Sequence, residues 1–399
     1  MQMQSVLVAL AATAVGAVKP LSIKGTDFVD ANGNKFQLVG VAYQPGGSAG
    51  YNPKKGKDPL SDPDTCMRDA ALLQVMGVNA IRVYNLDPNL NHDKCASIFN
   101  AAGMYMILDV NSPLVGEAIT SFEPWTSYYE AYSNRTFAIA EAFSNYPNTL
   151  MYFSGNEVIN DVPTAQFVPP YLRAVTRDLK NYIKKNIKRQ IPVGYSAADV
   201  REVLWDTWNY MQCSEPNDDG DMSRADVFAI NSYSWCGPDA TYESSSYDAQ
   251  LAKIDWEKVQ SQKASGKAPA APKCSSKLIQ VKGFDSNFTL PVPPPGVQGL
   301  IDNGIKNKPS GALVKISDWS VKLNVNDADG NKLTGLKVVP LSDDETNWSG
   351  KNSAETGSGD KDSSSSASKS DSKDKDSAAA WMRPASIALA LPLVAMLFI

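Results

Sequence analysis

The sequence predicts an α/β fold in which helices cover a parallel β-sheet. From residue 35 onward, β-rich runs alternate with longer amphipathic stretches of helical period. The β-rich runs are almost continuously apolar, which is typical of strands that are buried on both faces. The 399 residues also leave ample room for a (β/α)8 barrel, which takes about 250. We therefore expect a (β/α)8 TIM barrel.

Six segments have the composition of strands, and three of the stretches between them have a clear helical pattern. The expected strands are residues 37–44, 79–85, 104–110, 149–155, 191–195 and 226–235, and the expected helices are 62–76, 130–144 and 171–188. A closed barrel needs eight strand–helix units, so its last two strands are missing from this count. Residues 248–259 read as a further helix, followed by a linker rich in Lys, Ala and Pro. Six parallel strands would also fit an open, doubly wound sheet, so the count leaves both architectures open.

Polar or aromatic residues stand where each expected strand ends. These ends are Tyr43-Gln44, Tyr84-Asn85, Asp109 to Asn111, Asn156-Glu157, Asp199 to Arg201 and Tyr233 to Trp235. Any single one of them is also compatible with a capped helix start. Because the carboxyl ends of barrel strands converge on one face, the six together predict a single pocket, and the aromatic rings among them favour a carbohydrate cleft.

The clearest local signal for chemistry is Phe153-Ser-Gly-Asn-Glu157, an apolar strand that ends in an amide and a carboxyl group. A carboxyl group at a partly buried strand end suits a proton donor to a glycosidic oxygen, and Glu157 is the candidate. The Asn156 amide beside it is placed to bind a sugar 2-hydroxyl, a contact that strengthens as positive charge develops on the ring. An Asn-Glu pair alone is a weak motif, and its position at the end of the fourth expected strand gives it weight.

Composition indicates a neutral ligand and passage through the secretory pathway. The formal net charge is −5 and 20% of the residues are charged, which gives no sign of a polyanionic partner such as nucleic acid. Three N-glycosylation sequons begin at Asn134, Asn287 and Asn347. The five cysteines are compatible with disulfides in an oxidising compartment, and their odd number leaves one unpaired.

Both ends of the sequence resemble processing signals. Residues 1–17 hold an uncharged apolar run that ends in small residues, as a secretory signal peptide does, although a positive n-region is missing. The apolar tail 385–399 is too short to cross a hydrocarbon core of about 30 Å as a helix. With the small residues from Ser377 onward, it matches a signal for a glycosylphosphatidylinositol (GPI) anchor. The alternatives, a buried first helix and a tail-anchored membrane helix, fit these patterns less well.

Five regions are expected along the chain. They are a signal peptide at 1–17, a catalytic barrel at 18–265 that is incomplete after about 247, a Pro-rich and irregular segment at 266–345, a disordered stalk rich in Ser, Asp and Lys at 346–377, and a GPI-attachment propeptide at 378–399. Ser377 is the expected residue of lipid attachment.

Six motifs follow the expected strands between about residues 25 and 247. They are Gly40-Val-Ala-Tyr-Gln-Pro45, Asn79-Ala-Ile-Arg-Val-Tyr84, Ile107-Leu-Asp-Val-Asn111, Gly155-Asn-Glu157, Pro192-Val-Gly-Tyr-Ser196 and Ala229-Ile-Asn-Ser-Tyr-Ser-Trp-Cys-Gly237. Together they resemble the fungal GPI-anchored β-1,3-glucanosyltransferases of glycoside hydrolase family seventy-two. The resemblance implies that Glu157 is the acid/base, that Asn156 orients the donor sugar, and that no metal or organic cofactor takes part. It implies further glucan-binding positions at Tyr43, Gln44, Tyr84, Asn111, Asp199, Arg201 and Tyr233.

The catalytic nucleophile of that family is missing from this chain. Retaining enzymes need a second carboxylate about 5 Å from the acid/base. In the family it is a Glu in a Ser-Glu-Tyr-Gly-Cys-like motif after the stretch matched here by Trp235-Cys-Gly237, and no such motif occurs. Glu243 stands in a Ser-rich loop context and Glu257 in the expected helix 248–259, so neither is a candidate.

The cysteines point to the same gap. By the resemblance, Cys66 pairs with Cys95 and Cys213 with Cys274, and the missing motif would supply the partner of Cys236, which is left unpaired. The missing strands, nucleophile and cysteine all fall between residues 247 and 251. One internal deletion would explain all three.

The resemblance implies an enzyme that cleaves β-1,3-glucan through a covalent glycosyl-enzyme and transfers the new end to a second glucan chain. Its partners would be the glucan donor and acceptor, together with the plasma membrane through a GPI anchor. Its location would be the outer leaflet of the cell membrane and the cell wall. One alternative is a non-catalytic, GPI-anchored glucan-binding wall protein, since the nucleophile segment is missing. Another is an unrelated secreted hydrolase on an open sheet, which would need its own second carboxylate near Glu157.

Overall fold

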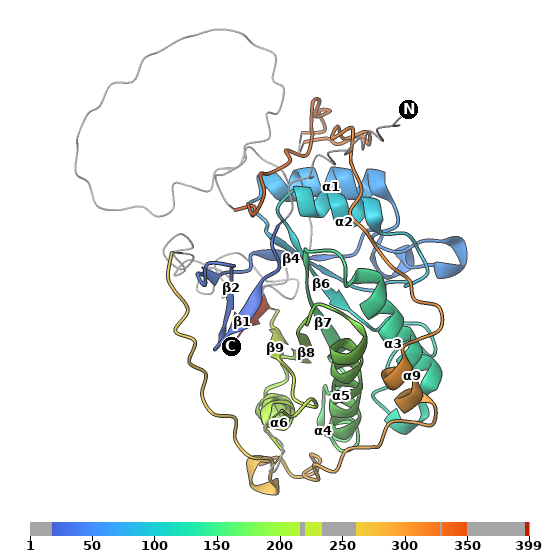
Figure 1. Cartoon of the computed structure of the whole chain (residues 1–399), viewed down its shortest axis with the longest axis vertical. Helices are drawn as coiled ribbons and strands as arrows, with labels where there is room; N and C mark the ends of the chain where they lie inside the picture. The colour runs from blue at the N-terminus through green and yellow to red at the C-terminus, as the bar shows by residue number, and fades with distance from the viewer. Residues whose placement is uncertain (1–17, 216–219, 234–260, 328, 349–395, 399) are drawn as a thin grey trace, which may run out of the picture.

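A sheet of six parallel strands forms the centre of the molecule (Figure 1). The computed structural model describes residues 18–215, 220–233, 261–327, 329–348 and 396–398. The parallel strands, in their order across the sheet, are β4 Gly40–Tyr43, β5 Ala80–Val83, β6 Tyr105–Asp109, β7 Thr149–Asn156, β8 Val193–Ala198 and β9 Val227–Asn231. Each strand pairs in parallel with the next. The expected parallel α/β class is therefore confirmed, and each of the six expected strands is present.

The sheet does not close among the described residues. Its outer parallel strands are β4 and β9, and β10 (Met396–Phe398) extends the β9 edge in an antiparallel sense. This edge of β9 is the place at which two further strands would continue a barrel.

Helices cover one face of the sheet. The helices are α1 Pro63–Val75, α2 Asp93–Ala101, α3 Glu130–Phe143, α4 Val162–Ala165, α5 Pro169–Asn186, α6 Arg201–Gln212 and α9 Val297–Asn303, and the 3-10 turns are η1 Gly47–Gly50, η2 Pro53–Lys55, η3 Pro124–Thr126 and η4 Ser276–Leu278. The three expected helices with stated bounds correspond to α1, α3 and α5, and no bounds were predicted for α2, α4, α6 and α9. None of the helices in the described ranges has the length and apolar character that crossing a membrane requires.

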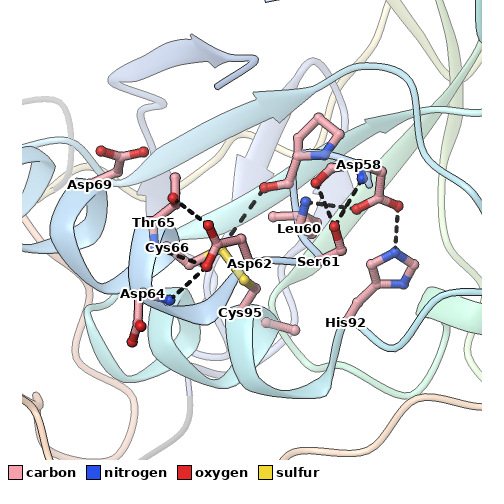
Figure 2. Close-up of a disulfide and its surroundings, with 12 residues drawn as sticks. Asp58, Leu60, Ser61, Asp62, Asp64, Thr65, Cys66, Asp69, His92 and Cys95 are labelled. Carbon is pink, nitrogen blue, oxygen red and sulfur yellow. Dashed lines mark hydrogen bonds and ion pairs between the residues drawn. A yellow bond between two sulfur atoms is a disulfide. The ribbon is translucent and has the colours of Figure 1, made fainter. Parts of the chain in front are cut away.

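Local sequence explains where α1 begins. The Asp62 side chain accepts hydrogen bonds from the backbone N–H groups of Asp64 and Thr65, and Pro63 occupies the first helical position. Both features are favourable at a helix N-terminus, because the first N–H groups have no partner within the helix. Figure 2 shows this cap beside the disulfide that joins α1 to α2.

A small antiparallel sheet covers the other face of the central sheet. It consists of β1 Ser22–Lys24, β2 Asp27–Val29 and β3 Lys35–Phe36. Phe28 from this sheet packs in one apolar cluster with Tyr105 and Met151 of the central strands. The Tyr105 hydroxyl also donates a hydrogen bond to the Lys19 carbonyl at 2.6 Å. The central strands are therefore buried on both faces, as their continuous apolar character predicts.

The described residues between 261 and 348 are mostly irregular apart from η4 and α9, and they pack against the central sheet and its helices. In Figure 1 this segment runs from yellow to orange around the outside of α3 and α5. Val297, Ile301 and Val338 from this segment belong to the apolar core on the helix side of the sheet. Its burial of apolar side chains makes it part of the same folded unit.

Two disulfides link parts of this folded unit that are distant in sequence. Cys66 is bonded to Cys95 between α1 and α2, and Cys213 at the end of α6 is bonded to Cys274 of the C-terminal segment. These are the pairs that the family resemblance implies. Cys236, the expected helix 248–259, Glu243 and Glu257 lie outside the described residues, as do the proposed signal peptide and Ser377.

One expected glycosylation site is wrong for the folded chain. Asn347 is fully buried, and its side-chain amide donates hydrogen bonds to the carbonyls of Gln74 and Val78, both at 2.9 Å. A glycan would replace one hydrogen of that amide and would have no room in this packing. Residue 347 therefore belongs to the folded unit and not to an exposed stalk. Asn134 and Asn287 are exposed.

Candidate active site

A buried arginine joins the carboxyl ends of five neighbouring strands. Arg82 of β5 donates hydrogen bonds to both carboxylate oxygens of Asp109, at 3.1 and 3.0 Å. It also donates to Asn156 Oδ1 at 2.7 Å, Ser196 Oγ at 3.0 Å and Asn231 Oδ1 at 3.0 Å. These partners stand on β6, β7, β8 and β9 respectively. The guanidinium group thus fixes the strand ends relative to one another.

Electrostatics and packing both hold this network in place. Burial raises the pKa of the Asp109 carboxyl, and the Arg82 guanidinium opposes that rise. The flat guanidinium group lies over the rings of Tyr84 and Phe153, with its central carbon 4.5 and 4.7 Å from the two ring centroids. Burial also raises the pKa of the Tyr84 hydroxyl, which keeps this group protonated well above physiological pH.

Glu157 follows β7 directly and is oriented by residues of β8 and β9. Its backbone adopts a left-handed conformation with φ of 50°, and its N–H donates to the Ser196 carbonyl at 2.8 Å. The side-chain oxygen Oε1 accepts hydrogen bonds from the Asn231 amide and, at 3.2 Å, from the Tyr233 hydroxyl. Such a backbone conformation is uncommon for a residue with a side chain and is concentrated at functional sites.

The arrangement leaves specific atoms for a ligand. Within the described part of the chain, both hydrogen bonds to the Glu157 carboxylate end on Oε1, which leaves Oε2 for a ligand. Asn156 Oδ1 accepts from both Arg82 and Asn231, at 2.7 and 2.9 Å. The Asn156 amide nitrogen is therefore the end that can donate to a ligand hydroxyl.

The other expected ligand positions lie at the same end of the sheet, with differing roles. Asn111 is held by the fold, because its amide donates to the Ser154 carbonyl at 2.9 Å and accepts from the Tyr132 hydroxyl at 2.7 Å. Asp199 accepts a hydrogen bond from Ser232 at 2.9 Å and forms an ion pair with the exposed Arg201.

Tyr43 does not line this site, contrary to expectation. Its side chain is 5% exposed, and its hydroxyl donates to Asp69 of α1 at 3.0 Å. Its ring packs edge-on against Phe99 of α2. Successive residues of a strand point to opposite faces, so Tyr43 and Gln44 cannot both face the cleft. Gln44 is the partly exposed member of the pair.

Sequence reasoning missed Arg82, Ser196 and Asn231 as members of the site. All three are polar side chains inside strands that are otherwise apolar, and all three are buried. A buried polar group needs a partner, so a charged or amide residue within an apolar strand was a usable signal.

The chemistry available here is that of an acid/base and hydrogen-bonding amides. The other carboxylate of the network, Asp109, has both oxygens held by Arg82. Across the described residues, no group of three or more His, Cys, Asp and Glu side chains is placed to hold a metal ion.

Comparisons with known proteins identify similar chains. Residues 10–259 match glycoside hydrolase family 72, described as Glucanosyltransferase. The 1,3-beta-glucanosyltransferase gel2 of Aspergillus fumigatus is 40% identical over 423 aligned positions, which cover 86% of this chain and 87% of the relative. The probable 1,3-beta-glucanosyltransferase GAS3 of Saccharomyces cerevisiae is 48% identical over 258 positions, 61% of this chain and 49% of the relative. The chain thus spans about half the length of GAS3.

Solved structures of Gas2p from Saccharomyces cerevisiae are similar as well. The apo structure has a TM-score of 0.51 and 32% identity, over 64% of this chain and 51% of that chain. The complex of Gas2p with laminaritriose and laminaritetraose has a TM-score of 0.50 and 28% identity, over 79% of this chain and 65% of that chain.

Proposed function

Because the chain belongs to the glucanosyltransferase family, glycoside hydrolase family 72, we propose that it acts on β-1,3-glucan as a 1,3-β-glucanosyltransferase. It cleaves a glucan chain and transfers the new end to another glucan, which lengthens the polymer. The observation that carries this proposal is the Glu157 carboxylate, held by Asn231 and Tyr233 at the carboxyl end of a parallel sheet. The resemblance to gel2 and to Gas2p supports the substrate class.

Glu157 acts first as an acid and then as a base. As an acid it protonates the glycosidic oxygen of the leaving glucan, and as a base it takes the proton of the acceptor hydroxyl. Asn156 donates to the 2-hydroxyl of the donor sugar, because its oxygen is already held by Arg82 and Asn231. Tyr84, Gln44, Asn111, Asp199, Arg201 and Tyr233 line the glucan path at the same end of the sheet.

The nucleophile belongs to a segment that this sequence lacks. Retention needs a carboxylate that bonds to the sugar carbon while Glu157 protonates the leaving group. Among the described residues no further parallel strand follows β9, which is where two more barrel strands would stand. The alignment with gel2 extends over 423 positions, more than the 399 residues of this chain, so that relative has long segments with no counterpart here. An internal deletion between residues 247 and 251 from a full (β/α)8 barrel accounts for these observations.

A second function follows for the 399-residue chain itself. Asp109 is the other carboxylate of the network, and Arg82 holds both of its oxygens. A chain that lacks a nucleophile opposite Glu157 would bind glucan and not transfer it, as a non-catalytic wall protein does. The two functions share the substrate and differ in the covalent step.

The substrate class can be tested by binding, which does not need the nucleophile. Titration calorimetry of the 399-residue chain should detect binding of laminaripentaose. It should detect no binding of cellopentaose, because β-1,3-linked and β-1,4-linked glucan chains curve differently. Replacing the exposed Tyr233 by Ala should weaken laminaripentaose binding about tenfold, as loss of a ring contact of about 1–2 kcal/mol implies. Tyr43→Phe is the matched control and should bind normally, because that ring faces α1 and α2. Equal affinity for the two pentasaccharides would refute the substrate class.

We further propose export and lipid anchoring, with residues 1–17 as signal peptide and 378–399 as the GPI-attachment propeptide. The support is compositional: a Ser, Asp and Lys stretch, small residues around Ser377, and an apolar tail. Phosphatidylinositol-specific phospholipase C should release the mature protein from fungal membranes. Mass spectrometry that finds an intact residue 399 on membrane-retained protein would contradict the anchor.

A further inference from the structure

Exposed aromatic side chains are concentrated on two loops. Phe122, Trp125 and Tyr129 lie in the loop between β6 and α3, and Phe167 lies in the segment between β7 and α5, just after the short helix α4. Their exposed fractions lie between 38% and 69%. We call these four residues the aromatic ridge. Large apolar side chains gathered on a surface commonly mark a binding site.

The ridge is built on a fixed support. The rings of Trp125 and Phe167 meet edge to face, with centroids 5.8 Å apart, so the two loops touch. Below them, Ile119 of the first loop and Ile159 of the second belong to the same buried apolar cluster. Rings held in this way lose little conformational freedom when a ligand binds.

Hydrogen bonds further order the loop after β6. The Thr120 N–H donates to Ser127 Oγ at 3.0 Å, and the Ser127 hydroxyl in turn donates to the Pro124 carbonyl at 2.9 Å. Gly116 has a φ of 83°, and a Cβ atom there would stand 2.5 Å from the Tyr129 hydroxyl. The loop therefore presents Phe122 and Trp125 outward while its own backbone is tied down.

The ridge is continuous with the candidate active site. The segment between β7 and α5 begins at Glu157, contains the short helix α4 and carries Phe167 near its end. Asn160 in this segment donates to the Glu157 carbonyl at 3.3 Å. The loop after β6 begins at Val110, whose carbonyl accepts a hydrogen bond from Arg135 at 2.7 Å. Both loops leave the sheet at the end where Glu157 stands.

The charge of the first loop indicates an uncharged occupant. Residues 111–129 contain two charged side chains, Glu117 and Glu123, and no Lys or Arg. Glu117 already pairs with Arg135 at 3.3 Å. A surface of aromatic rings and hydroxyl side chains with so little charge suits a sugar chain, whose ring faces are apolar and whose edges bear hydroxyls.

We propose that the aromatic ridge binds sugar units of a β-1,3-glucan chain that lie beyond those in the cleft at Glu157. This inference rests on the proposed function, because it takes the glucan cleft as its starting point. The ridge extends the binding surface along the chain, so it raises affinity for long glucans and leaves short oligosaccharides unaffected. Binding energy from such remote units can help to position the reacting bond.

Chain-length dependence of binding tests this proposal. Calorimetry of the 399-residue chain with laminaritriose and with a β-1,3-glucan of about ten units should give a lower Kd for the longer ligand. In Trp125→Ala, the Kd for the long ligand should rise about tenfold, as truncation of a central aromatic contact typically does, and the Kd for laminaritriose should not change. Trp125→Phe keeps a ring and should recover most of the affinity.

The matched control is Trp205→Ala, which removes an indole that is 61% exposed on α6, outside the ridge. Unchanged long-chain affinity in both Trp125→Ala and Phe122→Ala would overturn the proposal, as would an equal loss in Trp205→Ala. The ridge could instead be a contact between two copies of this chain. In that case sedimentation would show a dimer that Trp125→Ala dissociates, the glucan affinity of the variant would be normal, and the proposal would be overturned. If the wild-type chain bound neither ligand, the proposed function itself would fail.

Discussion

Replacing Arg82 by Met is expected to lower the free energy of unfolding by about 3–5 kcal/mol, the usual cost of leaving a buried charge without its partner. The Asp109 carboxylate is buried and receives two hydrogen bonds from Arg82. The acceptors Asn156, Ser196 and Asn231 would lose a donor in the same variant. Urea unfolding followed by circular dichroism measures the change.

Two further variants separate the network from a general effect of losing an arginine. Arg201→Met removes an exposed arginine whose ion pair with Asp199 lies at the surface, and it should cost less than about 1 kcal/mol. Adding Asp109→Leu to Arg82→Met removes both charges and should recover part of the loss. If Arg82→Met cost no more than Arg201→Met, Arg82 would not organise the strand ends.

The sheet could be predicted from sequence because its strands are buried on both faces. Continuous apolar runs such as 149–155, separated by amphipathic helices, are typical of parallel strands, and the polar residues after them locate the functional end of the sheet. The three strands β1 to β3 were not predicted, because strands of two or three residues are too short to show a period.

Two residues were wrongly assigned from sequence, Tyr43 to the cleft and Asn347 to a glycan. The first error concerns the direction of a side chain, and the second concerns packing between residues distant in sequence. Tyr43 was assigned to the cleft with Gln44, although alternation along β4 sends it toward α1 and α2. Asn347 was assigned a glycan, although it contacts Gln74, 273 residues away in sequence. A local pattern holds no information about such a partner. The role of Glu157 rests on its neighbours and remains a proposal.

Glu157→Gln is expected to suppress glucan transfer by about 10² to 10⁴, the usual contribution of a positioned acid/base. The test needs a protein into which the missing nucleophile segment of a family member has been inserted between residues 247 and 251. The amide of Gln keeps the size of the side chain and can still meet the Tyr233 hydroxyl, but it can neither give nor take the proton. Loss of activity with an unchanged far-ultraviolet spectrum would separate catalysis from folding.

We infer that this chain holds the acid/base of a transglycosylase and lacks its nucleophile. Product chromatography with reduced β-1,3-gluco-oligosaccharides distinguishes the alternatives in three proteins: the 399-residue chain, the chain with the inserted segment, and that longer chain with Glu157→Gln. We expect elongated products from the second protein alone, because a retaining transfer needs both carboxylates. Elongated products from the 399-residue chain would contradict this inference by requiring a nucleophile among the present residues, and an active Glu157→Gln protein would contradict the assignment of the acid.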